Sequence, residues 1–269
     1  MKAMILAAGE GTRLRPLTLE TPKVLLPVGG KPLIEYTLAW LKKHGIREVA
    51  INLYHLGHKI KEHLGDGSRF GMRIVYSEEE KLLGTAGGAK RMAHLLSPNP
   101  QSPFPSPFVV VYGDVLTNFN LTAMLQFHRE KSALATLALF RIPNPQSPVP
   151  SPQQIGVVEI NEEGRILSFI EKPQSPVPNP RSRIAVLGSG GIYVLEGKVL
   201  DYIPEDCPCD FAYDIFPRLI EAGEPVYGYI LSPGDVLIDI GTMDKYHKAQ
   251  EIVHQFKVQS ATLNLEHRT

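Results

Sequence analysis

Short apolar runs alternate with segments of helical periodicity along the first half of the chain. In the segment from Pro32 to His44, for example, Leu33, Tyr36 and Trp40 fall near one face of a helix. Such alternation is typical of a mostly parallel sheet covered by helices on both faces. The pattern predicts strands at Lys2–Ala8, Glu48–Leu53, Met72–Tyr76, Phe108–Tyr112 and Leu134–Arg141, and helices at Pro32–His44, Leu56–Leu64, Thr85–Leu96 and Leu121–Lys131.

The pattern changes after Gln154. Three strands follow with little helix between them, and a turn at residues 161–164 joins the first two as a hairpin. We therefore predict a mixed-sheet extension built on the same core, and not an independent second domain. The predicted elements are strands at Ile155–Ile160, Arg165–Glu171 and Gly191–Leu195, and helices at Phe211–Ala222 and Thr242–Val258.

A Pro-rich hexapeptide recurs between the predicted elements. Residues 98–103 and 143–148 are identical, and residues 173–180 contain a shuffled form. Proline of this density cannot continue a helix or a central strand. We interpret the three segments as insertions into surface loops, where extra length costs little closure entropy. A Pro-rich ligand for a protein partner is the alternative.

Charge and composition exclude several classes of protein. The 269 residues carry 28 basic and 28 acidic side chains, so no broad basic field is available to bind nucleic acid or a membrane surface. Cys207 and Cys209 are too close in sequence for an ordinary disulfide and fit a reducing compartment. The first apolar run is too short for a signal peptide, and none approaches membrane-spanning length. We expect a cytoplasmic protein.

The richest chemistry lies between the first predicted strand and Lys23. Gly9 and Gly11 allow the backbone to approach a ligand and to direct N–H groups at phosphate oxygens. Arg13, Arg15 and Lys23 add three cations for phosphate. A dinucleotide fingerprint would need a third glycine where Leu14 stands, and no Gly-Lys-Ser/Thr sequence completes a P-loop.

The string Gly9-Glu10-Gly11-Thr12-Arg13-Leu14-Arg15-Pro16-Leu17-Thr18, ending in Pro22-Lys23, resembles the sugar-1-phosphate nucleotidyltransferases, which make nucleotide sugars. The likeness extends from Met1 to about Val253 and is greatest to mannose-1-phosphate guanylyltransferases. Further matching motifs are Leu83-Gly84-Thr85-Ala86-Gly87-Gly88, Tyr112-Gly113-Asp114, Ile155-Gly156-Val157-Val158, Glu171-Lys172-Pro173, Gly190-Gly191-Ile192-Tyr193 and Ile238-Asp239-Ile240-Gly241.

The resemblance implies a Rossmann-like, doubly wound and mostly parallel sheet with a mixed-sheet, sugar-binding extension. Residues 1–269 would form one catalytic domain, with a nucleotide-binding half at 1–142 and a sugar-phosphate-binding half at 153–258. Many relatives carry a C-terminal β-helix domain. No hexapeptide repeat of that kind is present here, so we expect none.

Two aspartates follow apolar runs. Asp114 comes after the strand at Phe108–Tyr112, and Asp239 comes after Val236-Leu237-Ile238. A carboxylate at the carboxyl end of a strand lies where α/β sheets bind ligands, although Asp114 would also suit a turn or a helix start. The resemblance makes both Mg²⁺ ligands, which suits the preference of Mg²⁺ for oxygen.

The resemblance also assigns the remaining site residues. Without it, the Glu171-Lys172 pair would also fit a surface ion pair, and Gly84–Gly87 an ordinary helix start. The catalytic residues it implies are Arg13, Lys23, Asp114 and Lys172; the nucleotide-binding residues are Leu6, Ala8, Gly9, Gly11, Thr12, Arg13, Gly84, Thr85 and Ala86; the sugar-phosphate-binding residues are Lys23, Gly156, Glu171, Lys172 and Gly191.

The implied reaction transfers a nucleotidyl group from a nucleoside triphosphate to a sugar 1-phosphate and releases pyrophosphate. GTP and mannose 1-phosphate are favoured. A UTP- or dTTP-dependent enzyme acting on glucose 1-phosphate stays open, as does a catalytically inactive regulatory relative. The partners are the two substrates, with a homo-oligomer left open. The nine histidines show no metal-binding pattern, since His55 and His58 have no carboxylate beside them in sequence to complete a ligand set.

Overall fold

A computed structural model describes residues 1–97, 106–142, 155–173, 187–254 and 256. The Pro-rich segments predicted as loop insertions lie outside the described residues, apart from Pro173 at the edge of the third. Among the residues described, no helix has both the length and the apolar character needed to cross a membrane.

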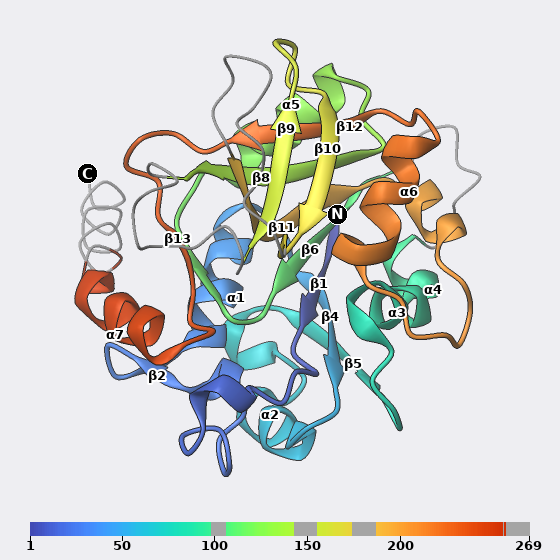
Figure 1. The fold of residues 1–269 in the computed structure, drawn as a ribbon. Helices are drawn as coiled ribbons and strands as arrows, with labels where there is room; N and C mark the ends of the chain where they lie inside the picture. The colour runs from blue at the N-terminus through green and yellow to red at the C-terminus, as the bar shows by residue number, and fades with distance from the viewer. Residues whose placement is uncertain (98–105, 143–154, 174–186, 255, 257–269) are drawn as a thin grey trace, which may run out of the picture.

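A nine-stranded sheet runs through both halves of the chain (Figure 1). Its order is β10-β9-β11-β6-β1-β4-β5, with β8 beside β11 and β12 beside β8. β6, β1, β4 and β5 are parallel, as the strand–helix alternation predicts. The strands are β1 (Lys2–Leu6), β4 (Glu48–Leu53), β5 (Arg73–Glu78), β6 (Phe108–Tyr112), β8 (Ala135–Arg141), β9 (Gly156–Ile160), β10 (Ile166–Glu171), β11 (Leu187–Leu195) and β12 (Val226–Ile230).

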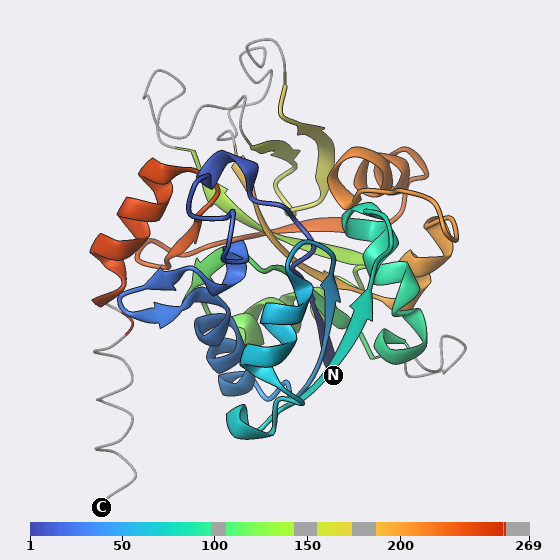
Figure 2. The ribbon, with the colours of Figure 1, turned by 90° about the horizontal axis from the view of Figure 1, so that it is seen from below.

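Helices cover both faces of the sheet, so the predicted α/β, Rossmann-like architecture is confirmed (Figure 2). Alternate residues of β1 point to opposite faces: Met4 packs with α3, α4 and α6, whereas Ala3 and Ile5 pack with α1, α2 and α5. The helices are α1 (Leu33–Lys43), α2 (Gly57–Leu64), α3 (Gly84–Arg91), α4 (Ala93–Leu96), α5 (Leu121–Glu130), α6 (Phe216–Glu221) and α7 (Met243–Ile252).

One long strand joins the parallel part of the sheet to the mixed part. The second half of β11 pairs antiparallel with β6, from Ile192 opposite Val111 onward. Its first two residues, Leu187 and Gly188, pair instead with β9. Between these stretches lies Gly191 with a φ of 69°, and the register with β8 shifts there. This bend attaches the β9–β10 hairpin, which is the predicted mixed-sheet extension.

Two short strands form a separate ladder beside the main sheet. β7 (Val115–Thr117) pairs antiparallel with β13 (Leu237–Asp239), so that Asp239 lies opposite Val115. A second small hairpin joins β2 (Pro27–Val28) to β3 (Lys31–Pro32). α7 packs against β13 and β2, which brings the end of the described chain beside its first 30 residues (Figure 1).

Several element boundaries differ from the predictions. β4 and β6 have the predicted bounds, but β7, β12 and β13 were not predicted. The single helix predicted at Thr85–Leu96 is divided into α3 and α4, because Met92 leaves helical geometry with φ −100° and ψ 14°. The helix predicted from Phe211 begins as a π-helix at Phe211–Ile215 before α6. Part of the predicted helix Thr242–Val258 lies outside the described residues.

We predict that Gly84→Ala destabilises the protein more than Gly30→Ala. Both glycines have positive φ, at +74° and +82°, so each alanine carries left-handed strain of about 1–2 kcal/mol. At Gly84 the new Cβ would also lie 2.4 Å from the Cys209 carbonyl oxygen, whereas at Gly30 it would meet nothing within 4 Å. Urea unfolding of the two variants measures the difference. Equal losses of unfolding free energy in the two variants would contradict a clash between the new Cβ and the Cys209 carbonyl oxygen.

Candidate active site

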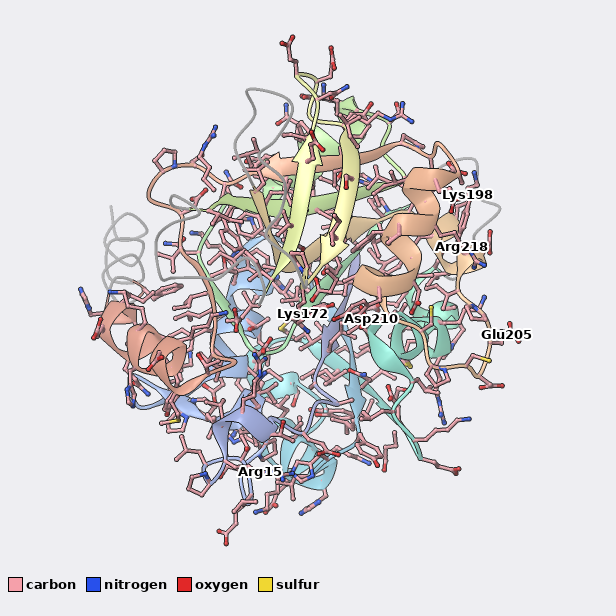
Figure 3. All side chains as sticks on the ribbon, viewed as in Figure 1. Arg15, Lys172, Lys198, Glu205, Asp210 and Arg218 are labelled. Carbon is pink, nitrogen blue, oxygen red and sulfur yellow. The ribbon has the colours of Figure 1, made fainter. Side chains whose placement is uncertain are left out.

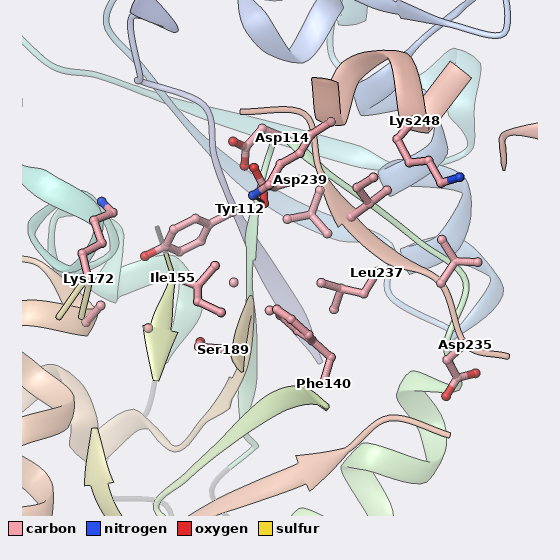
Figure 4. A pocket seen from close by; sticks show the side chains of 18 of the residues that line it. Tyr112, Asp114, Phe140, Ile155, Lys172, Ser189, Asp235, Leu237, Asp239 and Lys248 are labelled. Carbon is pink, nitrogen blue, oxygen red and sulfur yellow. Dashed lines mark hydrogen bonds and ion pairs between the residues drawn. The ribbon is translucent and has the colours of Figure 1, made fainter. Parts of the chain in front are cut away.

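The two predicted metal-binding aspartates lie side by side. Asp114 follows β6 after Gly113, whose N–H donates to the Leu6 carbonyl at 2.9 Å. Asp239 is the last residue of β13 and pairs with Val115, and the N–H of Ile240 donates to the Asp114 carbonyl at 2.9 Å. Figure 4 shows the two carboxylates next to each other on one wall of a cavity. The β7–β13 ladder therefore brings together two segments that are far apart in sequence.

Cations surround this pair of aspartates. The ammonium of Lys23 forms an ion pair with Asp114, and both side chains are less than one-fifth exposed. Lys245 makes the same contact with Asp239, at 2.5 Å between Nζ and Oδ2. Arg13 lies beside them. A Cβ built on Gly241 would be 2.6 Å from Asp239 Oδ1 and 3.0 Å from Arg13 Nη2, so the two side chains meet at this glycine. Three positive groups thus surround the two carboxylates, and two of them, Arg13 and Lys245, line the cavity with the aspartates.

The cavity has a volume of about 790 Å³ and lies between the aspartate pair and the β9–β10 hairpin (Figure 4). Phe140, Ile155 and Leu237 form an apolar wall. A void of this size accommodates a sugar phosphate together with part of a second ligand. The predicted site residues that line it are Arg13, Asp114, Gly156, Glu171, Lys172, Gly191 and Asp239.

Glu171 ends β10, and Lys172 follows it, at the far side of the cavity from the aspartates. Lys172 has a φ of 45°, and its N–H donates to the Ile155 carbonyl at 3.1 Å, which continues the pairing of β10 with β9 by one residue. Its Nζ lies 3.4 Å from Glu171 and 5.7 Å from the centre of the Tyr213 ring. Burial raises the pKa of Glu171, an effect that the Lys172 charge opposes. In the view of Figure 3, Lys172 and Asp210 are labelled next to each other near the middle of the picture.

The glycine turn after β1 lies on the other side of the aspartate pair. Gly9 is exposed, and a Cβ built there would meet no atom within 4 Å, so the space above this turn is open. Gly11 packs on Thr18, whose hydroxyl donates to the Gly11 carbonyl at 2.8 Å. The predicted residues outside the lining of the large cavity are Leu6, Ala8, Gly9, Gly11, Thr12, Lys23, Gly84, Thr85 and Ala86.

The start of α3 is tied to the segment before α6. The N–H groups of Ala86 and Gly87 both donate to the Cys209 carbonyl, at 3.0 and 3.1 Å. The Thr85 hydroxyl donates to Asp210 at 2.8 Å and accepts from the Phe211 N–H at 2.9 Å. A base contact from the Ala86 amide, which the resemblance implies, would therefore have to displace the Cys209 carbonyl.

One predicted phosphate donor lies away from the aspartates. The Arg15 side chain is about half exposed and lies 3.5 Å from Glu10, at the edge of the molecule in Figure 3. Arg13 reaches the cavity because it lies within the short 3₁₀ helix Thr12–Leu14, whereas Arg15 follows that helix in extended geometry. Sequence spacing could not separate the two arginines.

The sequence analysis gave no role to two residues that line the cavity, Tyr112 and Lys245. Tyr112 reads as part of an apolar strand, but its ring lines the cavity, and burial raises its pKa well above the usual value. Lys245 stands in the first turn of α7, three residues after the capping Thr242. Tyr112 stands in the matching motif Tyr112-Gly113-Asp114, but the motif carried no role for its ring. No motif marks Lys245, and only the placement of α7 against β13 brings it to Asp239.

The donor set fits a magnesium ion that also binds substrate. Within the described ranges, no cluster of three or more His, Cys, Asp or Glu side chains could hold a metal on its own. Asp114 and Asp239 supply two carboxylates that already attract positive groups, as the lysine contacts show. Mg²⁺ is commonly held by one or two carboxylates, with phosphate oxygens and waters as its other ligands.

Comparisons with known proteins identify related chains. A family model described as "Nucleotidyl transferase" matches residues 2–255. A UTP–glucose-1-phosphate uridylyltransferase of Synechocystis sp. is 38% identical over 93% of this chain and 62% of its own length. A mannose-1-phosphate guanylyltransferase of Mycobacterium tuberculosis is 35% identical over 85% of this chain and 58% of its own length. The chain thus spans about three fifths of these relatives.

A solved structure shows the same fold. A putative glucose-1-phosphate thymidylyltransferase from Bacillus anthracis superposes with a TM-score of 0.77 at 26% identity, covering 94% of each chain. The family model spans nearly all the described residues, including the glycine turn, both aspartates and the Glu171-Lys172 pair. This chain belongs to the nucleotidyl transferase family.

Proposed function

We propose that the protein transfers a nucleotidyl group from a nucleoside triphosphate to a sugar 1-phosphate. The observation that carries this proposal is the shared cavity. The aspartate pair lies at one end with Arg13 and Lys245, and the Glu171-Lys172 pair lies at the other. One end suits a polyphosphate, and the other suits a sugar phosphate. Relatives named for such reactions align with most of the chain.

The reaction needs no covalent intermediate on the protein. An oxygen of the sugar phosphate is already anionic at neutral pH and attacks the α-phosphorus of the triphosphate. The new P–O bond forms as the bond between the α-phosphorus and the bridging oxygen breaks, and pyrophosphate leaves with that electron pair. Because two anions must meet, catalysis consists of positioning and charge neutralisation.

The cations of the chain have separate roles in this scheme. Arg13, beside the aspartates, contacts the triphosphate. Lys23, which pairs with Asp114, would contact the attacking phosphate once that carboxylate is engaged elsewhere. Lys172 holds the sugar phosphate from the opposite side, and Glu171 accepts hydrogen bonds from sugar hydroxyls. Mg²⁺ held by Asp114 and Asp239 would supply further positive charge to the phosphates.

GTP and mannose 1-phosphate are the substrates we propose first, giving GDP-mannose. The Mycobacterium relative and the likeness of the motifs to guanylyltransferases support this choice. UTP or dTTP with glucose 1-phosphate is the second candidate. It is favoured by the Synechocystis relative, which aligns with more of the chain, and by the Bacillus structure.

A matrix of four nucleoside triphosphates against several sugar 1-phosphates tests the function, with pyrophosphate release as the readout. We expect the highest kcat/KM for GTP with mannose 1-phosphate. A higher value for UTP or dTTP with glucose 1-phosphate would establish the second candidate. A folded protein that releases no pyrophosphate with any pair would instead be an inactive regulatory relative.

Asp114→Asn should abolish turnover while the protein still unfolds cooperatively. The substitution keeps the shape of the side chain and removes its charge. We expect kcat to fall by more than about 10²-fold, the scale seen when one electrostatic group is lost from a transition state. Asp235→Asn is the matched control, because Asp235 also lines the cavity and its carboxylate accepts a hydrogen bond from the nearby Ser232 N–H. Full activity of Asp114→Asn with magnesium present would refute the metal assignment.

A further inference from the structure

A chain of buried hydrogen bonds connects the turns that follow β1 and β5. The N–H of Ala7 donates to Asn52 Oδ1 at 2.8 Å, and Asn52 Nδ2 donates to Glu79 Oε1 at 2.8 Å. The other oxygen of Glu79 accepts from the N–H of Leu83 at 3.0 Å. Since the Ala7 N–H requires an acceptor, the orientation of the Asn52 amide is fixed.

The position of Asn52 explains how one side chain spans the gap. Asn52 is the last residue but one of β4, and it lies between Leu6 of β1 and Ser77 of β5. Ala7 is the first residue after β1, and Glu79 is the first after β5. At the carboxyl ends of these parallel strands, side-chain hydrogen bonds continue where the backbone ladder stops.

The hydrogen-bond chain is shielded from solvent. Asn52 is 3% exposed and Glu79 is 7% exposed. α3 closes over them at Gly88, where a Cβ would lie 2.8 Å from Asn52 Nδ2 and from Glu79 Oε1. By contrast, the neighbouring Glu78 is exposed and pairs with Lys61 at the surface. If either partner were lost, a buried polar group would be left without a hydrogen bond, which costs folding free energy.

The two ends of this series of hydrogen bonds lie in or next to the two segments that we assign to nucleotide binding. Ala7 belongs to the Leu6–Gly9 turn, and Leu83 immediately precedes Gly84 at the start of α3. We propose that Asn52 and Glu79 are positioning residues that hold these two turns at a fixed separation, so that the nucleobase enters a preformed slot. This inference rests on the proposed function.

Single substitutions at Asn52 or Glu79 break this series of hydrogen bonds in a defined way. Asn52→Asp sets a carboxylate against the Glu79 carboxylate. Glu79→Gln forces an amide NH₂ to face either the Asn52 NH₂ or the Leu83 N–H, because only one of its two ends is an acceptor. Each change keeps the size of the side chain. We therefore expect each substitution to shift the two turns relative to each other and not to change the packing around them.

The double variant Asn52→Asp/Glu79→Gln restores the pattern. The new carboxylate accepts from the Ala7 N–H and from the new amide NH₂, and the amide oxygen accepts from the Leu83 N–H. All three hydrogen bonds return with the same total charge. Rescue by this exchange separates a specific bridge from a general requirement for polar residues at the two positions.

The test measures KM for the nucleoside triphosphate and for the sugar 1-phosphate in both single variants, the double variant and the control Glu78→Gln. Direct binding of the nucleoside triphosphate is measured by calorimetry. We expect each single variant to raise KM and Kd for the triphosphate by about tenfold or more, the scale of one lost buried hydrogen bond. KM for the sugar phosphate should stay within about twofold, a change well under the tenfold that one such bond is worth.

The double variant should return triphosphate binding to within about threefold of the starting protein, and Glu78→Gln should leave it unchanged. Equal rises in both KM values, or a double variant as impaired as the singles, would overturn the positioning role. If the singles do not fold, the double variant still decides, because it must both fold and bind. An unsubstituted protein that binds no triphosphate would defeat the proposed function itself, whereas normal binding by every variant would defeat only this inference.

Discussion

The pairing of β13 with β7 is the constraint on which the site depends. It is short, but its register places Asp239 against Val115 and so beside Asp114. The backbone hydrogen bond from Ile240 to Asp114 continues the contact beyond the ladder. Without this pairing the main sheet would still form, because β6 and β11 pair independently of β13. The carboxylate pair would not form.

The electrostatics of the aspartate pair follow from this placement. Two carboxylates held close together repel each other and favour a cation between or beside them. In the structure that charge comes from Lys23 and Lys245, one on each aspartate. A metal ion and a polyphosphate arriving together would offer new partners to both the carboxylates and the ammonium groups. Under the proposed function, the lysines would exchange carboxylate oxygens for phosphate oxygens.

The sequence predicts the framework better than the site. β4 and β6 were bounded correctly because a buried parallel strand is a continuous apolar run that ends in a turn. β12 was missed because Gly228 interrupts it, yet this glycine lets the strand pack closely on Leu139. β7 and β13 have three residues each, too few for a period to show.

At the candidate site, motifs marked the residues in the sequence, and tertiary contacts decide where each side chain lies. Arg13 and Arg15 look equivalent in sequence, and only the 3₁₀ turn separates them. Glu79 stands in a run of three glutamates that suggests a solvated surface, but it is buried and bonded to Asn52. Burial of a single member of a charged run depends on where the next helix packs. Sequence pattern alone does not contain that information.

The two ends of the site are held by different means, and this difference bears on how it binds. On the side that we propose for the nucleoside, buried polar contacts such as those of Asn52 and Thr85 fix the backbone of the turns. On the side that we propose for the phosphates, long side chains including the half-exposed Lys172 carry the charge. A fixed slot loses little conformational entropy when a flat, rigid base enters it. Phosphates change position and charge during the reaction, so groups on flexible stems can follow them while the base stays in place.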